Sequence, residues 1–420
     1  MKKKYLLVTL LAVLQVTMAF APAYPEAGND LKKAAKAYAS QEYELALELY
    51  RKVLQKNPDH LQANLRAGIC YLDLLQPAKA FEHLEFAYKK DPKVTDEILM
   101  LLGEAQQQLY NFEEAMGYFR TELASLSRAE SWNKEFLLKR LRECESGLAL
   151  SANPVLAQIT NLGPAINSPY SDYVPVMLPG DTLLLYTTRR PVSEARGRTG
   201  VVEYMHVSKL RNGAWQQAEL FLQDAAKLPD HSAVSVAPNG QELYTYFGGK
   251  NRGLFMSEKA GQGWSDPVRL GSPFNEGTVE TSMHVTDDGK FAFFSSDRPG
   301  GFGGLDLYIC YKQENGTWSD ALNLGPAINS AYDEDAPFVD VKTNTLYFSS
   351  RGHNAIGGYD VFKSSIKDSV WSQAQNLGMP VNSPFDDIYF SLTHNRDKAI
   401  FSSDRPGGHG RKDVYFITFK

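Results

Sequence analysis

Five acidic residues stand at matching places in a segment that repeats through the C-terminal two thirds of the chain, each at the start of an expected β-strand. They are Asp172, Asp230, Glu280, Glu334 and Asp387. If these strands surround a common axis, their carboxylates form a ring at one mouth of a central channel. Carboxylates held close together repel one another, so a cation, a water network or a basic group of a partner would stabilise the ring. The first candidate chemistry is therefore ligand binding at an acidic mouth, with a divalent cation as one candidate occupant.

Two other interpretations of this acidic column remain open. An acid at a strand start can accept backbone N–H groups of its own loop, and a repeat copies such a structural role into every unit. We favour this interpretation. The other alternative is a carbohydrate-active enzyme (a five-bladed glycoside hydrolase) or a glycan-binding lectin. A glycoside hydrolase needs two carboxyl groups with different roles, about 5 to 9.5 Å apart, whereas these acids recur alike in every repeat. We therefore predict a protein that is not an enzyme.

A second set of polar residues lies in a recurring hairpin that reads Ser-Ser-Asp-Arg-Pro-Gly-Gly at 295–301 and 402–408. We expect its acids to fix turns and its arginines to pair with acids of neighbouring repeats. A shorter form, Ser-Ser-Arg, stands at 349–351. The candidate contacts between repeats or within loops are Asp297, Arg298, Arg351, Asp404 and Arg405.

Other residue types offer little chemistry. The sequence contains no phosphate-binding loop, zinc-binding pattern or catalytic triad that we can assign. His231 and His284 fall in inner strands of adjacent repeats and could reach a ligand in the channel, although we expect them to be packed or solvated. The cysteines Cys70, Cys144 and Cys310 form no disulfide framework, and we expect buried, unpaired thiols. We predict no catalytic residue, no metal site and no cofactor apart from a divalent cation in the channel.

The elements that must position the acids are short strands. From Val155 onward, short apolar runs alternate with Gly, Asn, Asp and Pro, and the pattern repeats at about 50 residues, the spacing of propeller blades. Each of four repeats carries one tryptophan, and a Leu-Gly pair follows three of them. The tryptophans are Trp215, Trp264, Trp318 and Trp371. Counting the hairpins predicts five blades, at approximately 164–221, 222–271, 272–325, 326–378 and 379–420.

The last blade lacks a tryptophan and an outer strand, whereas 157–163 precedes the first blade and reads like an outer strand. We therefore expect this N-terminal strand to complete the last blade and close the ring, which removes free sheet edges. The predicted propeller covers 155–420.

These motifs resemble the TolB-type, WD-repeat-like propeller repeats of envelope proteins of Bacteroidetes. The phrases that carry the resemblance are NSPYSDYVPV at 167–176, FSSDRPGG at 294–301 and GGLDLY at 303–308. The resemblance spans 155–420 and implies an all-β propeller in the cell envelope.

The segment 27–150 has helical periodicity and repeats at about 34 residues. In three repeats a small residue is followed twelve positions later by Ala, as in the pair Gly68 and Ala80, which lets two antiparallel helices approach closely. These residues resemble the tetratricopeptide repeat (TPR), a family that binds peptides and proteins. Family members that grip a C-terminal carboxylate carry Lys and Asn where this chain has apolar residues, so we expect an apolar groove. Its candidate lining residues are Leu31, Leu65, Ile69 and Met100.

The N-terminus reads as a secretory signal peptide, because three lysines precede an apolar run and small residues stand at 21 and 23. We predict a signal peptide over 1–23 and an exported protein that is periplasmic or associated with the outer membrane. No cysteine follows the apolar run closely, which argues against a lipoprotein. The formal net charge is −5, which gives the chain no electrostatic reason to bind nucleic acid.

The order of a TPR module and a TolB-type propeller is similar to the front part of PorE-like proteins, which are associated with the type IX secretion and gliding machinery. Those proteins carry an additional OmpA-like domain that holds peptidoglycan. Because this chain lacks it, the resemblance gives no support for peptidoglycan binding. We expect an α-solenoid followed by an all-β five-bladed propeller, acting as a scaffold for envelope proteins or peptides.

Overall fold

A computed structural model describes residues 28–126, 131–191, 201–221, 230–237, 239–249, 252–261 and 263–420 of the chain. The predicted signal peptide lies outside these residues. The chain divides into two compact units, with the division between Leu109 and Tyr110. No helix within the described residues is both long enough and apolar enough to cross a membrane.

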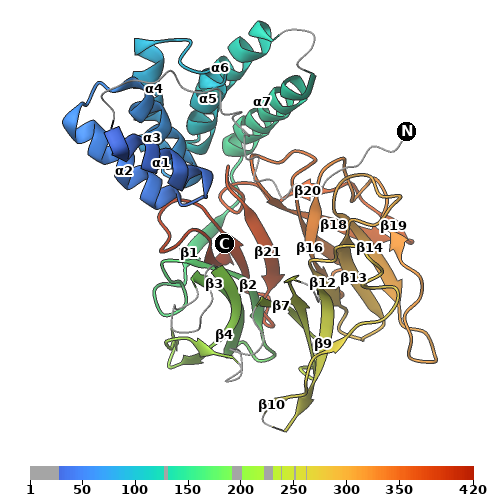
Figure 1. Ribbon diagram of the computed structural model, residues 1–420. Coiled ribbons are helices and arrows are strands. Elements are labelled where there is room, and N and C mark those ends of the chain that lie inside the picture. Colours follow the sequence, from blue (N-terminus) through green and yellow to red (C-terminus); the bar gives the residue numbers. More distant parts are fainter. Residues whose placement is uncertain are drawn as a thin grey trace. The chain divides into compact units, whose positions relative to one another are not determined.

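The N-terminal part of the described chain is helical, as the 34-residue repeat predicts (Figure 1). Its helices are α1 (Gly28–Ala39), α2 (Tyr43–Lys56), α3 (Leu61–Asp73), α4 (Pro77–Lys90), α5 (Ile98–Gln108), α6 (Phe112–Ser125) and α7 (Ser131–Ala152). The first unit holds α1 to α5, and α6 and α7 belong to the second unit.

The small residues of the repeat bring paired helices together. A Cβ atom added to Gly68 on α3 would lie 2.7 Å from Cγ of Leu84 on α4 and 3.2 Å from the carbonyl oxygen of Ala80. Ala80 and Leu84 are fully buried. The prediction that small side chains permit close packing of α3 against α4 is therefore confirmed. Pro77 begins α4, where its missing N–H costs no helical hydrogen bond.

The described residues of the C-terminal part form five antiparallel sheets, which are the predicted blades. Each starts at an inner strand, and Figure 1 shows β2, β7, β12, β16 and β21 grouped at the centre of this part of the chain. Blade 1 contains β2 (Ser171–Met177), β3 (Leu183–Pro191), β4 (Val201–Arg211), β5 (Ala214–Trp215) and β6 (Glu219–Leu220). Blade 2 contains β7 (His231–Val236), β8 (Glu242–Phe247), β9 (Gly253–Ala260), β10 (Gly263–Trp264) and β11 (Val268–Arg269).

The next two blades follow the same order. Blade 3 contains β12 (Met283–Val285), β13 (Phe291–Ser296), β14 (Asp306–Tyr311) and β15 (Leu322–Asn323). Blade 4 contains β16 (Glu334–Asp340), β17 (Thr345–Ser350), β18 (Asp360–Lys367), β19 (Val370–Trp371) and β20 (Gln375–Asn376).

Blade 5 is built from both ends of the propeller sequence. Its strands β21 (Asp387–Leu392), β22 (Lys398–Ser403) and β23 (Asp413–Phe419) are followed in the sheet by β1 (Ala157–Asn161). Strand β1 runs antiparallel to β23, with Ile159 opposite Ile417. The predicted closure of the ring by the N-terminal strand is therefore confirmed.

The hydrophobic core of the propeller lies between neighbouring blades. One cluster, for example, joins Leu254 of blade 2 to Phe294 of blade 3, and another joins Tyr186 of blade 1 to Ile400 of blade 5. Each of the four marker tryptophans packs on the cluster between its own blade and the preceding one. They are Trp215, Trp264, Trp318 and Trp371. The recurrence of tryptophan thus reflects blade packing.

Several inner strands contain a β-bulge, where one extra residue interrupts the pairing with the next strand. The register shifts in β2, β7, β16 and β21. At three of these bulges a residue with a side chain adopts a positive φ: 51° at Val174, 53° at Ala336 and 61° at Tyr389. This conformation is strained for such residues, and for a β-branched valine above all.

Candidate functional site

The predicted acidic column is buried in the loops that lead into the inner strands. The side chains of Asp172, Glu280, Glu334 and Asp387 are fully buried. Three of them accept two hydrogen bonds from a serine four residues earlier, one from its backbone N–H and one from its hydroxyl. The donor–acceptor distances are 2.6 and 2.7 Å for Ser168 and Asp172, 2.7 and 2.6 Å for Ser330 and Glu334, and 2.7 and 2.7 Å for Ser383 and Asp387.

The remaining two acids differ in detail. Glu280 accepts the backbone N–H of Asn275 at 3.1 Å and the hydroxyl of Ser296 at 3.0 Å. Asp230 has a φ of 60°, and its carbonyl oxygen accepts the N–H of Gly248 at 2.8 Å. Four of the five carboxylates therefore hold their own loops, as the structural interpretation expects.

The structure differs from the candidate ring of carboxylates at the channel mouth. Each of the four buried acids is turned into its own loop and accepts hydrogen bonds there, although Oδ1 of Asp172 has no hydrogen-bond partner among the described residues. This arrangement favours loop support over a shared acidic mouth. Among the residues that the structure describes, no three His, Cys, Asp or Glu side chains are placed so that they could hold a metal ion.

Burial still affects the proton affinity of these acids. Burial raises the pKa of Glu334 to about 7, against the lowering effect of hydrogen bonds from Ser330 and Ser350. It also raises the pKa of Asp172 above its usual value. Removal from water therefore changes the pKa of both carboxyl groups more than their hydrogen bonds do.

The hairpin residues divide into contacts within a blade and contacts between blades. Arg298 Nη2 lies 3.4 Å from Glu280, and Arg405 Nη2 lies 2.5 Å from Asp387, so each arginine pairs with the acid of its own blade. The prediction that these two arginines connect blades is wrong, because the hairpin folds back beside the start of its own inner strand. Arg351 does connect blades, with Nη2 3.1 Å from Asp386 of blade 5.

The two predicted turn acids hold the backbone just before the inner strand. Asp297 Oδ1 accepts the N–H of Val279 at 2.7 Å, and Asp404 Oδ1 accepts the N–H of Asp386 at 2.8 Å. These contacts fix the loop before the inner strand to the end of the second strand of the same blade.

A partly buried ionic cluster connects blades 4 and 5. Asp386 accepts hydrogen bonds from Arg351 at 3.1 Å and from Lys412 Nζ at 3.0 Å, and Lys412 also lies 3.8 Å from Asp404. Burial acts to raise the pKa of Asp386, but the two cations hold it well below its usual value. Burial raises the pKa of Asp404 to about 6. These charges compensate one another across the interface between the two blades.

An asparagine column that sequence reasoning missed holds four of the five blades to the blade before them. Asn329 accepts the N–H of Leu307 at 2.8 Å and donates to the carbonyl oxygen of Leu307 at 3.0 Å. Three more asparagines bind the preceding blade in the same two-bond manner. The pairs are Asn167 with Val414, Asn275 with Leu254, and Asn382 with Val361. The sequence feature that could have revealed this column is an Asn-Ser dipeptide before three of the acids. Its Asn stands five residues, and its Ser four residues, before the acid.

Glycines in the loops before the third strands let neighbouring blades touch. A Cβ atom on Gly303 would overlap the carbonyl oxygen of Tyr332 in blade 4, and one on Gly410 would overlap that of Tyr170 in blade 1. Gly357 meets the carbonyl oxygen of Pro384 in blade 5 in the same way. These three glycines therefore serve the packing of blade against blade.

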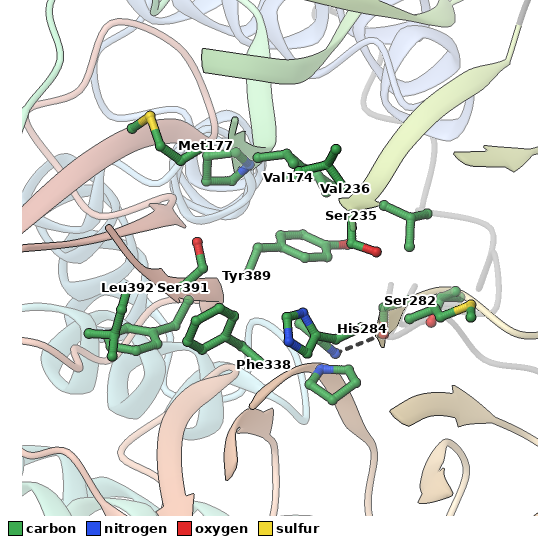
Figure 2. Close-up of a pocket in the computed structure, with 18 residues that line it drawn as sticks. Val174, Met177, Ser235, Val236, Ser282, His284, Phe338, Tyr389, Ser391 and Leu392 are labelled. Carbon is green, nitrogen blue, oxygen red and sulfur yellow. Dashed lines mark hydrogen bonds between the residues drawn. The ribbon is translucent and has the colours of Figure 1, made fainter. Parts of the chain in front are cut away.

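The inner strands line a half-open cavity of about 100 Å³ on the propeller axis. Residues from all five blades line it, including Val174, Val236, His284, Phe338 and Tyr389 (Figure 2). In β2, β16 and β21 the acids occupy the first or second residue, whereas the cavity is lined by later residues of the same strands. The described residues that line the cavity include no Asp, Glu, Lys or Arg.

In the helical unit, the predicted groove residues lie on the first helix of each repeat. Leu31 on α1, Ile69 on α3 and Met100 on α5 are partly exposed. Leu65 is only 2% exposed and packs inside the helical core, so it is not available to a ligand. This differs from the prediction because Leu65 points into the core, whereas Ile69, one turn later on α3, remains partly accessible.

Comparisons with known proteins find fold likenesses for separate parts of the chain. No family model matches the sequence, and no curated protein matches it. The first TPR of Spaghetti (RPAP3), solved with an HSP90 peptide, is 19% identical with a TM-score of 0.25, over 29% of this chain and 90% of that one.

Two solved propellers are similar to the C-terminal part. TolB from Acinetobacter baumannii is 13% identical with a TM-score of 0.37, over 67% of this chain and 70% of that one. An α-L-arabinofuranosidase from Lactobacillus brevis is 12% identical with a TM-score of 0.41, over 61% of this chain and 92% of that one.

Proposed function

We propose that this chain is a non-catalytic scaffold of the cell envelope that binds protein partners through its TPR helices and its propeller. The observation that carries the proposal is the use of the propeller's recurring polar residues. Four of the five acids, and the asparagines and arginines described above, are engaged in hydrogen bonds within and between blades. A repeat whose recurring polar groups hold its own loops and blades together suits a rigid platform for partners better than a catalytic site.

The helical unit supports the same proposal. Leu31 and Met100 stand at equivalent places in the first and third repeats, and Ile69 lies on the first helix of the second. These partly exposed side chains are apolar, so they suit an apolar face of a partner helix or extended segment rather than a terminal carboxylate. We propose that the first helices of the repeats are where a partner peptide binds.

Photo-crosslinking in the native envelope tests this part of the proposal. A photoreactive phenylalanine analogue replaces Ile69 or Met100 in the full chain, and the same analogue replaces Leu45 of α2 as a matched control. Leu45 is an apolar residue with 45% exposure, so it reports contact with any nearby protein. We expect discrete crosslinked products at Ile69 and Met100 that are absent at Leu45. The same products at all three positions, or none at any, would contradict a binding site on these helices.

Substitutions in the full chain provide a second test of this binding site. Ile69→Glu combined with Met100→Glu places charge on the proposed surface without changing the buried core, and Leu45→Glu is the control. The partner identified by crosslinking should be lost from the double variant and retained by the control. Retention by both variants would assign the interaction to another surface.

We propose that the protein is located in the cell envelope and, more specifically, that it is associated with the type IX secretion machinery. This proposal rests on the signal-like N-terminus and on the resemblance of the propeller phrases to TolB-type repeats of Bacteroidetes. Determining the N-terminal sequence of the protein isolated from the envelope tests export. A mature terminus near residue 24 supports it, and an intact terminus in the cytoplasmic fraction contradicts it.

The alternative function is a carbohydrate-active enzyme or lectin that uses acids at the propeller mouth. Glycoside hydrolysis requires a pair of carboxyl groups facing the sugar, whereas Asp172 and Asp387 are fully buried and bonded to their own loops. A panel of glycans should show no hydrolysis by the full chain. Reproducible turnover that disappears in Asp172→Asn or Asp387→Asn would overturn the scaffold proposal.

A further inference from the structure

The cavity on the propeller axis has largely apolar walls. Valine, methionine, leucine and phenylalanine supply half of its lining residues, and the described lining residues carry no charged group. Figure 2 shows Tyr389 lying across the space between Val174 and Met177 on one side and His284 and Phe338 on the other. An ion would lose its hydration in such a space without compensation, so the cavity suits uncharged contents.

One buried polar atom in this wall has no partner. His284 is 8% exposed, and among the described residues its Nε2 atom has no hydrogen-bonding partner. Its other ring nitrogen hydrogen-bonds the backbone of Val339, which places the proton on Nδ1 and leaves Nε2 as an acceptor. Burial lowers the pKa of His284 to about 4, so the ring is neutral at physiological pH.

A second polar group adds to the same wall. The hydroxyl of Ser235 is buried and unpartnered within the described residues, and Ser235 lines the cavity from β7. Unpaired buried polar atoms are costly, and they are retained where a ligand or ordered water satisfies them. The three strained bulge residues, Val174, Ala336 and Tyr389, also line this cavity. Strain of this kind clusters at binding and catalytic sites.

We propose that the axial cavity is a binding site for a small uncharged molecule that donates a hydrogen bond to Nε2 of His284 and buries an apolar body among the inner strands. The volume sets the size of the ligand. An apolar cavity of about 150 Å³ accommodates benzene in another protein, so this smaller space suits a ligand of roughly four or five non-hydrogen atoms. A short branched alcohol has the required size, donor and apolar surface.

Two probes of the same size and shape test the donor requirement. 2-Propanol carries a hydroxyl donor, whereas acetone has the same number of non-hydrogen atoms and only an acceptor. Methyl NMR spectra of the full chain with labelled methionine report binding, because Met177 and Met283 line the cavity and Met100 lies in the other unit. We expect 2-propanol to shift the Met177 and Met283 signals saturably and to leave Met100 unchanged.

The affinity for acetone should be weaker by roughly threefold to tenfold, the range that one net hydrogen bond supplies. The ¹⁵N spectrum of His284 gives an independent readout, since a donor on Nε2 shifts that nitrogen and not Nδ1. Equal affinities for the two probes, or an unchanged Nε2 signal at saturation, would overturn the proposal. The absence of a saturable shift with either probe would show that the cavity holds only water and would also overturn it.

Substitutions locate the acceptor. His284→Leu should reduce the affinity for 2-propanol to that for acetone, and His284→Gln, which retains an acceptor, should recover part of the difference. If His284→Leu fails to fold, Val236→Phe fills the cavity and should abolish the response to both probes. Unchanged 2-propanol binding in a folded His284→Leu or Val236→Phe protein would contradict a site at this place.

Discussion

The side-chain amide of Asn329 forms two hydrogen bonds with the backbone of Leu307 in the preceding blade, one with its N–H at 2.8 Å and one with its carbonyl oxygen at 3.0 Å. Leu307 is the second residue of β14, and its carbonyl oxygen also accepts the N–H of Leu324 at 3.1 Å. The amide therefore adds to the strand pairing of this carbonyl and supplies the acceptor for the Leu307 N–H at the place where two blades meet. The same arrangement at three further interfaces makes it a repeated element of ring cohesion.

Asn329→Ala should destabilise the propeller because it leaves the buried N–H of Leu307 without its partner, whereas the carbonyl oxygen of Leu307 keeps the hydrogen bond from Leu324. An unpaired buried group costs about 1–3 kcal/mol, so we expect a loss of about 2 kcal/mol in the free energy of unfolding. Chemical denaturation followed by tryptophan fluorescence measures it. Asn354→Ala is the control, because Asn354 is exposed in the hairpin of blade 4. Equal stabilities of the two variants would show that the amide contacts contribute little.

Gly410→Ala should weaken the closure of the ring between blades 5 and 1. The added Cβ would overlap the carbonyl oxygen of Tyr170, and a backbone atom cannot move aside without displacing its loop. Overpacking of this kind costs about 1–3 kcal/mol. Gly271→Ala is the matched control, since a Cβ there meets nothing within 4 Å. Thermal unfolding of both variants checks the prediction, and a Gly410→Ala protein as stable as the control contradicts it.

The number and order of the blades could be predicted from the sequence because their marker residues recur at a nearly fixed spacing. Trp318 and its equivalents, and the apolar strand that completes blade 5, are visible as periodic features and lie where the repeat predicts. The partner of each recurring polar residue is not visible in this way. Arg298 and Glu280 are separated by 18 residues in the chain and meet within one blade, whereas Arg351 reaches the next blade. A periodic pattern states which residues recur but not whether the contact is made within a repeat or between repeats.

The proposed axial site also could not be predicted from the sequence. A β-bulge changes which side chains of an inner strand face the axis. The residue types around Val174 and Tyr389 do not predict that these two residues adopt a positive φ. His284 was identified as a residue that could reach the channel, but its tautomer depends on the carbonyl of Val339, more than 50 residues later in the chain. Such long-range backbone contacts decide the chemistry of the site.

Ile159→Asp should detach the closing strand β1 from blade 5. Ile159 faces the cluster that contains Ile417 and Phe401, whereas its neighbour Thr160 is exposed. A carboxylate at Ile159 would be placed against this apolar cluster without a partner, and loss of β1 would uncover the edge of β23. We expect faster proteolysis between α7 and blade 1 and a tendency to associate, measured by limited proteolysis and light scattering. Thr160→Asp should behave as the unsubstituted protein, and identical behaviour of the two variants would contradict the closing role of β1.

The pH dependence of stability should reveal the buried carboxyl group of Glu334. Burial raises its pKa from 4.5 to about 7 in the folded protein. The folded state therefore holds this proton more tightly than the unfolded state. Its contribution to stability is fully present below pH 4.5 and is lost as the pH rises through 7.

Glu334→Gln removes this titration and retains a carbonyl acceptor for the donors of Ser330 and Ser350. The free energy of unfolding of the variant, relative to the unsubstituted protein, should increase by roughly 3 kcal/mol between pH 4.5 and pH 8, the value that corresponds to this shift in pKa. Denaturant unfolding at several pH values measures the difference, and Glu314→Gln, at an exposed position of blade 3, should parallel the unsubstituted protein. A difference between Glu334→Gln and the unsubstituted protein that stays constant with pH would show that Glu334 is ionised in both states across this range, and that its hydrogen bonds outweigh the loss of water.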